Sequence, residues 1–487
     1  MYRILNIQVS ESDAVYAYLD RIAHLSNNLS NAVLFRQRQM ITSAKKDVKD
    51  WTDNEKEIRD EVEATIQYLG NTRKIPKSGV LSYNFAERVL RVTQNPDFFA
   101  EGLPRQTAQW IVKQVCTDIS SFYKAMKQYA VTPELFTGKP ELPGYKRKGG
   151  ACSFRITNQD CVIRQKENGA YDIKLPLTKD TVCIGKTCPG ILKEVHVSPK
   201  NRRYQLSLVF DDGKALPVME EKPERIIAID PGVNNLMAVT NNCGLPCLLY
   251  KGGVIKSVNQ RYNKRVAKIM SKQTKGSDKK FVPTEEYWKV TNYRNDKIRD
   301  VMLKAGKSLI LWCVENRIDT IVIGSTPGWK QKVSLGKETN QKFVQIPFDR
   351  LKHILKYQGE RTGIRILEQE EAYTSKASFM DQDEIPDLGE EASFSGTRIQ
   401  RGLYRTKDGE NINADLNGSA NILRKAFPDA FSGKSVLDFK NIVVIKHPDE
   451  MLKNQKNVVP VERDTGDVNP HQVERRSRLN GNLNLIP

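Results

Sequence analysis

The alternation of apolar and polar positions divides the first part of the chain into one strand followed by helices. Residues 1–10 predict a strand and residues 11–130 predict helices, and the clearest helical periodicity runs over 103–129. Pro104 stands near the start of that segment, where a proline suits a first helical turn. Its apolar face comprises Trp110, Ile111, Val115, Ile119, Phe122 and Met126. We interpret this face as core packing and the charged segment 46–74 as a pair of solvated helices.

The pattern changes near residue 136. Proline, glycine and the basic run of Lys146, Arg147 and Lys148 interrupt the helices. Short segments of alternating character follow, at 161–165, 171–177, 193–199 and 202–210. Their regular spacing predicts a small antiparallel barrel, which the strand at 1–10 could complete, with the helices as an insertion.

A third pattern begins at residue 224. A buried strand leads to Asp230 and a Pro-Gly turn, and two more strand-like segments follow as in a β-meander. The order of the later elements is that of an RNase H-like fold. They are a basic helical stretch at 256–280, a helix at 290–317, a strand at 319–325, a helix at 347–361, a strand at 363–371, an irregular insertion at 374–410 and a helix at 412–427. The tail from 432 offers no convincing core element, and we expect its end to be disordered.

Three acids occupy corresponding ends of these elements. Asp230 ends the first strand, Glu371 ends the strand before the insertion, and Asp415 begins the closing helix. In an RNase H-like fold such acids meet at one sheet edge, where they suit two Mg²⁺ or Mn²⁺ ions roughly 3.5–4 Å apart. Taken singly, Asp230 equally suits a turn cap or the phosphate contact of an actin-like ATPase, and Asp415 suits a helix N-cap.

Charge adds a partner to this picture. The chain has 77 basic and 58 acidic side chains, a net charge of +19, which favours a polyanion partner, most often nucleic acid. Residues 251–280 hold ten Lys or Arg against one acid. We therefore expect phosphate contacts there, besides the basic run near 147. The candidates are Arg261, Lys264, Arg265 and Lys268.

Composition excludes several protein classes. The chain has 487 residues and 39% hydrophobic content, as in a globular protein of several domains. It has no run of about 18 apolar residues and no signal-peptide pattern, so we expect a cytoplasmic protein without a membrane partner. Its eight cysteines include no Cys-x-x-Cys pair. We therefore expect neither disulfides nor a zinc site.

Three motifs resemble the RuvC nuclease core of TnpB (OrfB) proteins, which bacterial insertion sequences encode and which are related to type V CRISPR effectors. The motifs are IAIDPGVNNLMAV, EEAYTSKASF and INADLNGSANILRKAF, and FTGKPELPGYKRK and FRITNQ resemble the family as well. The resemblance covers about residues 1–430. It implies an RNA-guided DNA endonuclease that needs a short motif beside its target. Its partners would be a guide RNA and double-stranded target DNA with its separated strands.

The resemblance also implies an α/β multidomain architecture: an RNase H-like (RuvC) nuclease domain, a small wedge β-barrel and a helical recognition domain inserted in the barrel. The expected boundaries are 1–10 and 136–222 for the barrel, 11–135 for the helical domain, 223–373 and 411–431 for the nuclease, 374–410 for a target-nucleic-acid-binding insertion and 432–487 for the tail.

The middle acid departs from the family pattern. Relatives carry a glutamate at a strand end where this chain has IVIGSTPGWKQ, so Gly324 takes its place. Neighbouring strands lie about 4.8 Å apart, so a glutamate one strand over could reach the same ions. We prefer Glu371 and leave Glu370 and Glu368 as rivals. Glu370 and Glu371 face opposite sides of an alternating strand, so only one of them should bind metal.

The insertion departs as well, because relatives hold a four-cysteine zinc ribbon there and this chain has no cysteine between 374 and 415. We expect the insertion to fold without zinc or to become ordered on nucleic acid. Its candidates for phosphate contacts are Arg398, Arg401 and Arg405, and Trp329 or Tyr373 could stack on bases or simply pack in the core.

Three rival functions follow from the same residues. A nuclease-inactive RNA-guided repressor is the main alternative, because Gly324 replaces an expected acid. A guide-independent junction resolvase would not need the helical and barrel regions. An actin-like ATPase would need a second Asp-x-Gly phosphate motif, which the chain lacks. The sequence does not distinguish a transposon-derived guide from a CRISPR RNA, and it does not specify the flanking motif, the guide length, the oligomeric state or protein partners.

Overall fold

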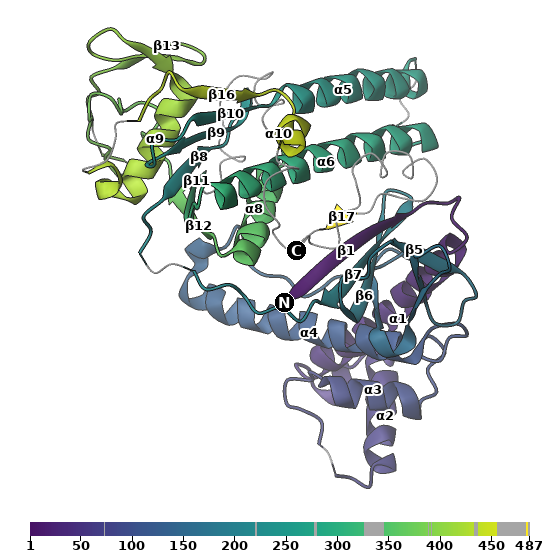
Figure 1. Cartoon of the computed structure of the whole chain (residues 1–487). Coiled ribbons are helices and arrows are strands. Elements are labelled where there is room, and N and C mark those ends of the chain that lie inside the picture. The colour runs from purple at the N-terminus through teal and green to yellow at the C-terminus, as the bar shows by residue number, and fades with distance from the viewer. Residues whose placement is uncertain are drawn as a thin grey trace. The chain divides into compact units, whose positions relative to one another are not determined.

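The described residues fold into two compact units, one within 1–213 together with 484–485 and the other within 214–454 (Figure 1). The computed structural model describes residues 1–72, 74–219, 222–276, 280–325, 345–387, 389–390, 392–432, 437–454 and 484–485. Among the helices in these ranges, none has the length and apolar character needed to cross a membrane.

The helices of the first unit confirm the expectation for 11–130. They are α1 (Tyr16–Ser43), α2 (Asp53–Tyr68), α3 (Tyr83–Val92) and α4 (Arg105–Val131). In α4 the side chains of Ile111, Val115 and Ile119 are buried, whereas Phe122 and Met126 are only half-buried. The predicted helical pair at 46–74 is wrong. That segment holds the 3₁₀ turn η1 (Val48–Asp50) and the single helix α2, because Thr52 caps α2 and ends the preceding turn.

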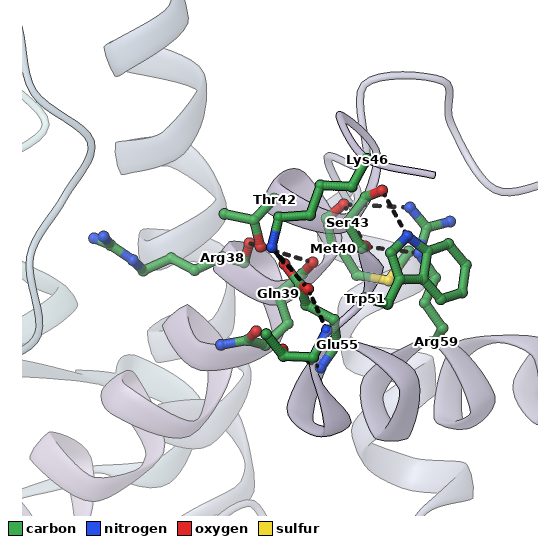
Figure 2. A network of polar contacts seen from close by, with 10 residues as sticks. Arg38, Gln39, Met40, Thr42, Ser43, Lys46, Trp51, Glu55 and Arg59 are labelled. Atoms are coloured by element: carbon green, nitrogen blue, oxygen red, sulfur yellow. Dashed lines mark hydrogen bonds and ion pairs between the residues drawn. The ribbon is translucent and has the colours of Figure 1, made fainter. Parts of the chain in front are cut away.

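A buried polar network fixes the junction between α1 and α2 (Figure 2). The carboxylate of Glu55, only 2% exposed, accepts a 2.9 Å hydrogen bond from Lys46 and another from the backbone N–H of Thr52. Thr52 in turn accepts from the N–H of Glu55, which completes a capping box. The guanidinium of Arg59 lies over the Trp51 ring. Burial opposes ionisation of Glu55, but the hydrogen bonds from Lys46 and its neighbours prevail and lower its pKa to about 2.

Antiparallel sheets complete the first unit. The strands are β1 (Tyr2–Val9), β2 (Phe154–Thr157), β3 (Val162–Gln165), β4 (Tyr171–Lys174), β5 (Thr181–Gly185), β6 (Ile191–Lys200), β7 (Arg203–Asp211) and β17 (Asn484–Leu485). One sheet has the order β17-β1-β7-β6-β2 and the other the order β3-β4-β5. The pairing of β1 with β7 confirms that the N-terminal strand joins the later strands. The described pairings form these two sheets, and closure into a barrel stays a prediction.

One mixed sheet organises the second unit. Its strands are β8 (Ile226–Asp230), β9 (Asn235–Asn241), β10 (Cys247–Lys251), β11 (Thr320–Ser325), β12 (Arg365–Glu370) and β16 (Ile442–Ile445), in the order β12-β11-β8-β9-β10-β16. The strands β8, β9 and β10 are antiparallel neighbours, whereas β11 runs parallel to both β8 and β12. The helices are α5 (Gly253–Thr274), α6 (Glu285–Glu315), α8 (Phe348–Thr362), α9 (Ala414–Ala426) and α10 (Pro448–Asn454).

Alternation along β8 explains how helices cover both faces of this sheet (Figure 1). Ile226 and Ala228 pack with Ile422 of α9, while Ile227 and Ile229 belong to the core that includes α6 and α8. Successive side chains of a strand point to opposite faces, so the next position, 230, belongs on the face that α9 covers. The sequence therefore directs the acid at the end of β8 toward the closing helix.

The tail contributes more than the sequence predicts. The expectation that it holds no core element from 432 is wrong, because β16 pairs in parallel with the edge strand β10 and Ile445 is 2% exposed. Leu437 and Phe439 are also buried. Only four residues make up β16. Such a short strand gains its stability from an existing sheet edge rather than from a long apolar pattern.

The insertion is also more regular than expected. The strands β13 (Thr397–Gln400), β14 (Leu403–Arg405) and β15 (Asn411–Asn413) form a small antiparallel sheet. Tyr404, fully buried at its centre, donates a hydrogen bond to the carbonyl of Lys376. The description of 374–410 as irregular is therefore wrong for this part. The strands are too short for a period-2 pattern to be distinctive.

Candidate active site

Asp230 lies at the end of β8 and against α9. The residue is partly exposed, unlike the four buried residues before it. A Cβ atom at Gly418 of α9 would lie 2.8 Å from the Asp230 Oδ2 atom, which is closer than real Cβ contacts come. The glycine thus permits α9 to approach the carboxylate directly.

Glu371 follows β12 directly, and its side chain lies over Gly324 in the neighbouring strand. A Cβ atom at Gly324 would lie 2.6 Å from the Glu371 Oε2 atom. In β11, Gly324 follows Ile323, which pairs with Ile229 of β8, so Gly324 stands beside Asp230. The carboxylate of Glu371 therefore occupies the space where a side chain at 324 would begin.

Asp415 lies in the first turn of α9, where an acid also complements the helix dipole. Asn413 caps the helix by accepting hydrogen bonds from the N–H groups of Asp415 and Leu416. Asn235 of β9 donates a 2.6 Å hydrogen bond to the Asp415 Oδ2 atom, and Arg398 of β13 lies 3.5 Å from its other oxygen. Asp415 is thus oriented by an amide and a guanidinium.

The three acids act on one another electrostatically. Although Asp230 keeps some exposure, its carboxyl group is surrounded by protein, and this desolvation raises the pKa of that carboxyl well above its usual range. The negative charges of Glu371 and Asp415 raise the pKa further, and the charge of Arg398 opposes them. Carboxylates that repel one another in this way are a setting that a bound cation relieves. Three elements distant in the sequence therefore bring negative charge to one place.

The three carboxylates are of the right chemical type to bind a metal ion, but their side chains are not placed to bind one in this structure. Carboxylate oxygens are the ligands that Mg²⁺ and Mn²⁺ prefer. Among the residues that the structure describes, no group of three or more His, Cys, Asp or Glu side chains is placed to hold a metal ion. Asp415 is instead engaged by Asn235 and Arg398. Binding a cation between the acids would require these side chains to rearrange.

The two rival glutamates are engaged elsewhere. Glu370 accepts a 2.8 Å hydrogen bond from Lys425 and a 2.7 Å hydrogen bond from the N–H of Ala372. The hydrogen bond from Lys356 contributes most to lowering the pKa of Glu368 to about 2, and Lys352 contributes as well. Of the three glutamates, Glu371 is the one whose charge acts on Asp230, and its role as a metal ligand stays a proposal.

The predicted basic contacts lie on exposed surfaces of both units. In the first unit, Asn31 of α1 holds the backbone of Lys146 through two hydrogen bonds, and the side chains of Arg147 and Lys148 are exposed. In the second unit, the predicted candidates on α5 and in the small sheet are all exposed. They are Arg261, Lys264, Arg265, Lys268, Arg398, Arg401 and Arg405.

The two aromatic candidates have different outcomes. Trp329 lies outside the described residues. The Tyr373 ring lies 6.1 Å from the ring of Phe394 and 5.6 Å from the Lys376 ammonium, so it already has neighbours within the protein. Base stacking by Tyr373 stays a prediction.

Sequence reasoning missed the residues that orient the acids. Asn235 is 4% exposed and receives a hydrogen bond from Lys251 while it donates to Asp415. Gly418 lies against Asp230. Both residues are within motifs that were recognised, IAIDPGVNNLMAV and INADLNGSANILRKAF. A buried asparagine in a strand was the available signal, since a polar side chain there needs a partner.

Two family models match segments that lie almost wholly in the second unit. Residues 211–329 match the OrfB_IS605 family, described as a probable transposase, and residues 348–422 match the Cas12f1-like TNB domain. A TnpB-like protein, ORF457 of Acidianus two-tailed virus, is 22% identical over 226 residues. The match covers 45% of this chain and 46% of that protein, so it spans less than half of the relative's length.

Solved structures are similar at low identity. A Cas12f1–sgRNA–target DNA complex is 11% identical, with 81% of this chain and 82% of that chain covered and a TM-score of 0.44. The C2c1 protein of Alicyclobacillus acidoterrestris with single-guide RNA is 8% identical, with 82% and 70% covered and a TM-score of 0.29.

The chain combines an α/β architecture of two units with an OrfB_IS605 match and a Cas12f1-like TNB match at the sheet that carries the acids. Its resemblance to TnpB proteins is supported by the viral relative. In the part that carries the three acids, this chain is similar to TnpB-type proteins.

Proposed function

We propose that this protein is an RNA-guided DNA endonuclease, a metal-dependent enzyme that hydrolyses target DNA at Asp230, Glu371 and Asp415. The observation that carries the proposal is the convergence of these acids: Glu371 lies over Gly324, and α9, which carries Asp415 in its first turn, approaches the Asp230 carboxylate at Gly418. The charges of Glu371 and Asp415 both act on Asp230. The strand order of the second unit supports it, because β10-β9-β8-β11-β12 is the order of an RNase H-like nuclease.

The acids would hold two Mg²⁺ or Mn²⁺ ions, which supply an activated water and stabilise the leaving oxygen of the phosphodiester. Asp230 and Asp415 present carboxylates from β8 and α9, and Glu371 supplies the one that Gly324 cannot. Asn235 keeps the Asp415 carboxylate oriented through its 2.6 Å hydrogen bond. Arg398, which pairs with Asp415 in this structure, would leave it and meet a phosphate of the scissile strand. The expected products carry a 5′-phosphate and a 3′-hydroxyl.

Nucleic-acid binding follows from charge. Exposed Lys and Arg side chains of the loop at 146–148, of α5 and of the small sheet would contact phosphates without regard to sequence. Base pairing with the guide RNA would then supply target specificity, while the protein reads heteroduplex shape and a short flanking motif. The wedge and helical regions of the first unit are the expected place for that reading.

The test is cleavage by the full chain purified with the RNA that accompanies it. Sequencing that RNA identifies the guide, and a DNA carrying its complement beside randomised flanking bases serves as substrate with Mg²⁺. We expect cutting by the wild type. Asp230→Ala should reduce it by at least about 1,000-fold while target binding persists, because it removes a central metal ligand. Binding of no discrete RNA would contradict the guided mechanism and favour a junction resolvase.

A nuclease-inactive RNA-guided repressor is the second candidate. Two observations favour it: the described residues include no group of three side chains placed for a metal ion, and Arg398 lies on Asp415. The same assay separates the two functions. Wild-type protein that binds guide-matched DNA in Mg²⁺ and Mn²⁺ and never cuts it would be a repressor.

A further inference from the structure

We propose that Thr374 and Asn421 are positioning residues for Glu371, which they tie to α9 without touching substrate or metal. The inference rests on the proposed nuclease function and adds to it. It concerns how a glutamate that is not part of a regular strand acquires a fixed position.

Thr374 anchors the main chain of Glu371. Its Oγ1 atom donates a 2.9 Å hydrogen bond to the Glu371 carbonyl oxygen, and its backbone N–H approaches the same oxygen at 3.3 Å. Thr374 is 3% exposed, so this hydroxyl has little access to water. Tyr373, between the two residues, adopts a positive φ of 63°, a conformation that needs support from its surroundings. The turn after β12 thus depends on the threonine.

Asn421 ties this turn to α9. Its Nδ2 atom donates hydrogen bonds to the carbonyl oxygens of Thr374 at 2.9 Å and Ala377 at 2.7 Å. One turn earlier, Asn417 donates to the same Ala377 carbonyl and accepts from the N–H of Phe379. Both asparagines are fully buried. Buried amides that satisfy several backbone groups hold a loop in one conformation, since each lost hydrogen bond would leave a polar atom unpaired.

Arg424 fixes which way the Asn421 amide points. Its Nη2 atom donates a 3.0 Å hydrogen bond to the Asn421 Oδ1 atom, so the Nδ2 atom faces the loop carbonyls. The same Nη2 atom donates to the carbonyl of Asp383, at 2.6 Å. Arg424 therefore joins Asn421 to the start of the insertion.

One helix therefore organises all three acids. Asp415, Gly418 and Asn421 recur every three residues, a spacing at which each is a neighbour of the next on the surface of α9. The first is itself an acid of the site, the second lies against Asp230, and the third holds the turn behind Glu371. A helix that carries one acid, contacts the second and holds the turn after the third is a way to fix their mutual distances, which metal-ion chemistry requires.

The test measures Mn²⁺ affinity by electron paramagnetic resonance on the full chain, with Mn²⁺ as the only added ligand. Thr374→Val keeps the shape of the side chain and removes the hydroxyl, and Thr374→Ser keeps the hydroxyl. Thr320→Val is a matched control, because Thr320 is 1% exposed and lies at the start of β11, four positions before Gly324. We expect Thr374→Val to weaken Mn²⁺ binding about 10-fold, as is typical of residues that orient metal ligands, with both other variants near wild type.

Thermal unfolding of the same variants separates positioning from stability. If Thr374→Val and Thr320→Val lower the melting temperature equally but only the former loses Mn²⁺ affinity, the hydroxyl acts through Glu371. Wild-type Mn²⁺ affinity in Thr374→Val would overturn the inference. Wild-type affinity in Asp230→Asn would instead overturn the proposed metal site, so the two failures are distinguishable. If Asn421→Ala remains folded, it should lose as much Mn²⁺ affinity as Thr374→Val. If Asn421→Ala does not fold, the Mn²⁺ affinity of Thr374→Val alone tests the inference.

Discussion

At the scale of single residues, two glycines set the geometry of the acids. Gly324 and Gly418 each lack the side chain that would collide with a carboxylate, that of Glu371 and Asp230 respectively. Gly324 also leaves room for the side chain of Glu371. A strand position beside Asp230 without a side chain leaves space, and the next strand supplies the acid that fills it.

Replacing Gly324 by alanine should therefore affect activity more than stability. The new Cβ would lie 2.6 Å from the Glu371 Oε2 atom and 2.7 Å from the Ile422 Cδ1 atom, and both are ends of flexible side chains that can shift. We expect a stability cost of about 1 kcal/mol but a loss of cleavage rate of about 10- to 100-fold, because Glu371 is displaced. Single-turnover cleavage and thermal unfolding measure the two effects.

Gly253→Ala is the matched control, because no atom lies within 4 Å of a Cβ at that position. An unchanged cleavage rate in Gly324→Ala would show that cleavage does not depend on the present position of the Glu371 carboxylate.

At the scale of elements, the junction of α1 and α2 shows how a buried acid stabilises the connection between two helices. Glu55 completes the cap of α2 and binds Lys46 (Figure 2). Its pKa is lowered from 4.5 to about 2, so its contribution to stability is present above pH 4.5 and is lost as the pH falls toward 2.

Glu55→Gln should test this contribution. Glutamine can still serve in the capping box but cannot pair with the Lys46 charge, so we expect destabilisation of about 1 kcal/mol at neutral pH. The difference from wild type should shrink as the pH is lowered below about 4, since the wild-type carboxylate then begins to lose its advantage. Thermal unfolding at several pH values measures it, and a difference that grows on acidification would contradict the assignment.

Elements also mark where sequence reasoning succeeds. The strand ending at Asp230 and the helix beginning near Asp415 could be predicted, because long apolar runs or a clear helical face define them. The insertion sheet and β16 could not, because strands of three or four residues have too short a pattern. Glu371 could be proposed only because Gly324 stands where an acid is expected, which directs attention to the neighbouring strand. The hydrogen bond from Asn235 to Asp415 could not be proposed at all, since it depends on how β9 and α9 come together in the folded chain.

At the scale of the whole molecule, the net charge of +19 should make nucleic-acid binding strongly salt-dependent. The α5 side chains of Lys264 and Lys268 are exposed and lie one helical turn apart. Lys264→Ala with Lys268→Ala should weaken RNA binding and reduce the slope of log affinity against log salt by about 1.4, the value for two contacts to single-stranded phosphates.

The control for that pair is Lys289→Ala with Lys297→Ala on α6, where both lysines pair with acids of their own helix. Filter binding of the co-purified RNA at increasing NaCl measures each slope. Equal slopes for the two double variants would show that Lys264 and Lys268 of α5 do not contact the RNA.

The parallel strand β16 also has a consequence for biosynthesis. It comes from residues 442–445, after the helix that carries Asp415, and it covers the edge of β10, whose residues are 247–251. On the ribosome that edge stays open while roughly 190 further residues are made, which at about 5–20 residues per second lasts tens of seconds or less. The sheet of the second unit is therefore completed late in translation. In a stalled or truncated nascent chain, the unpaired β10 edge is the place where pairing with a strand of another chain would begin.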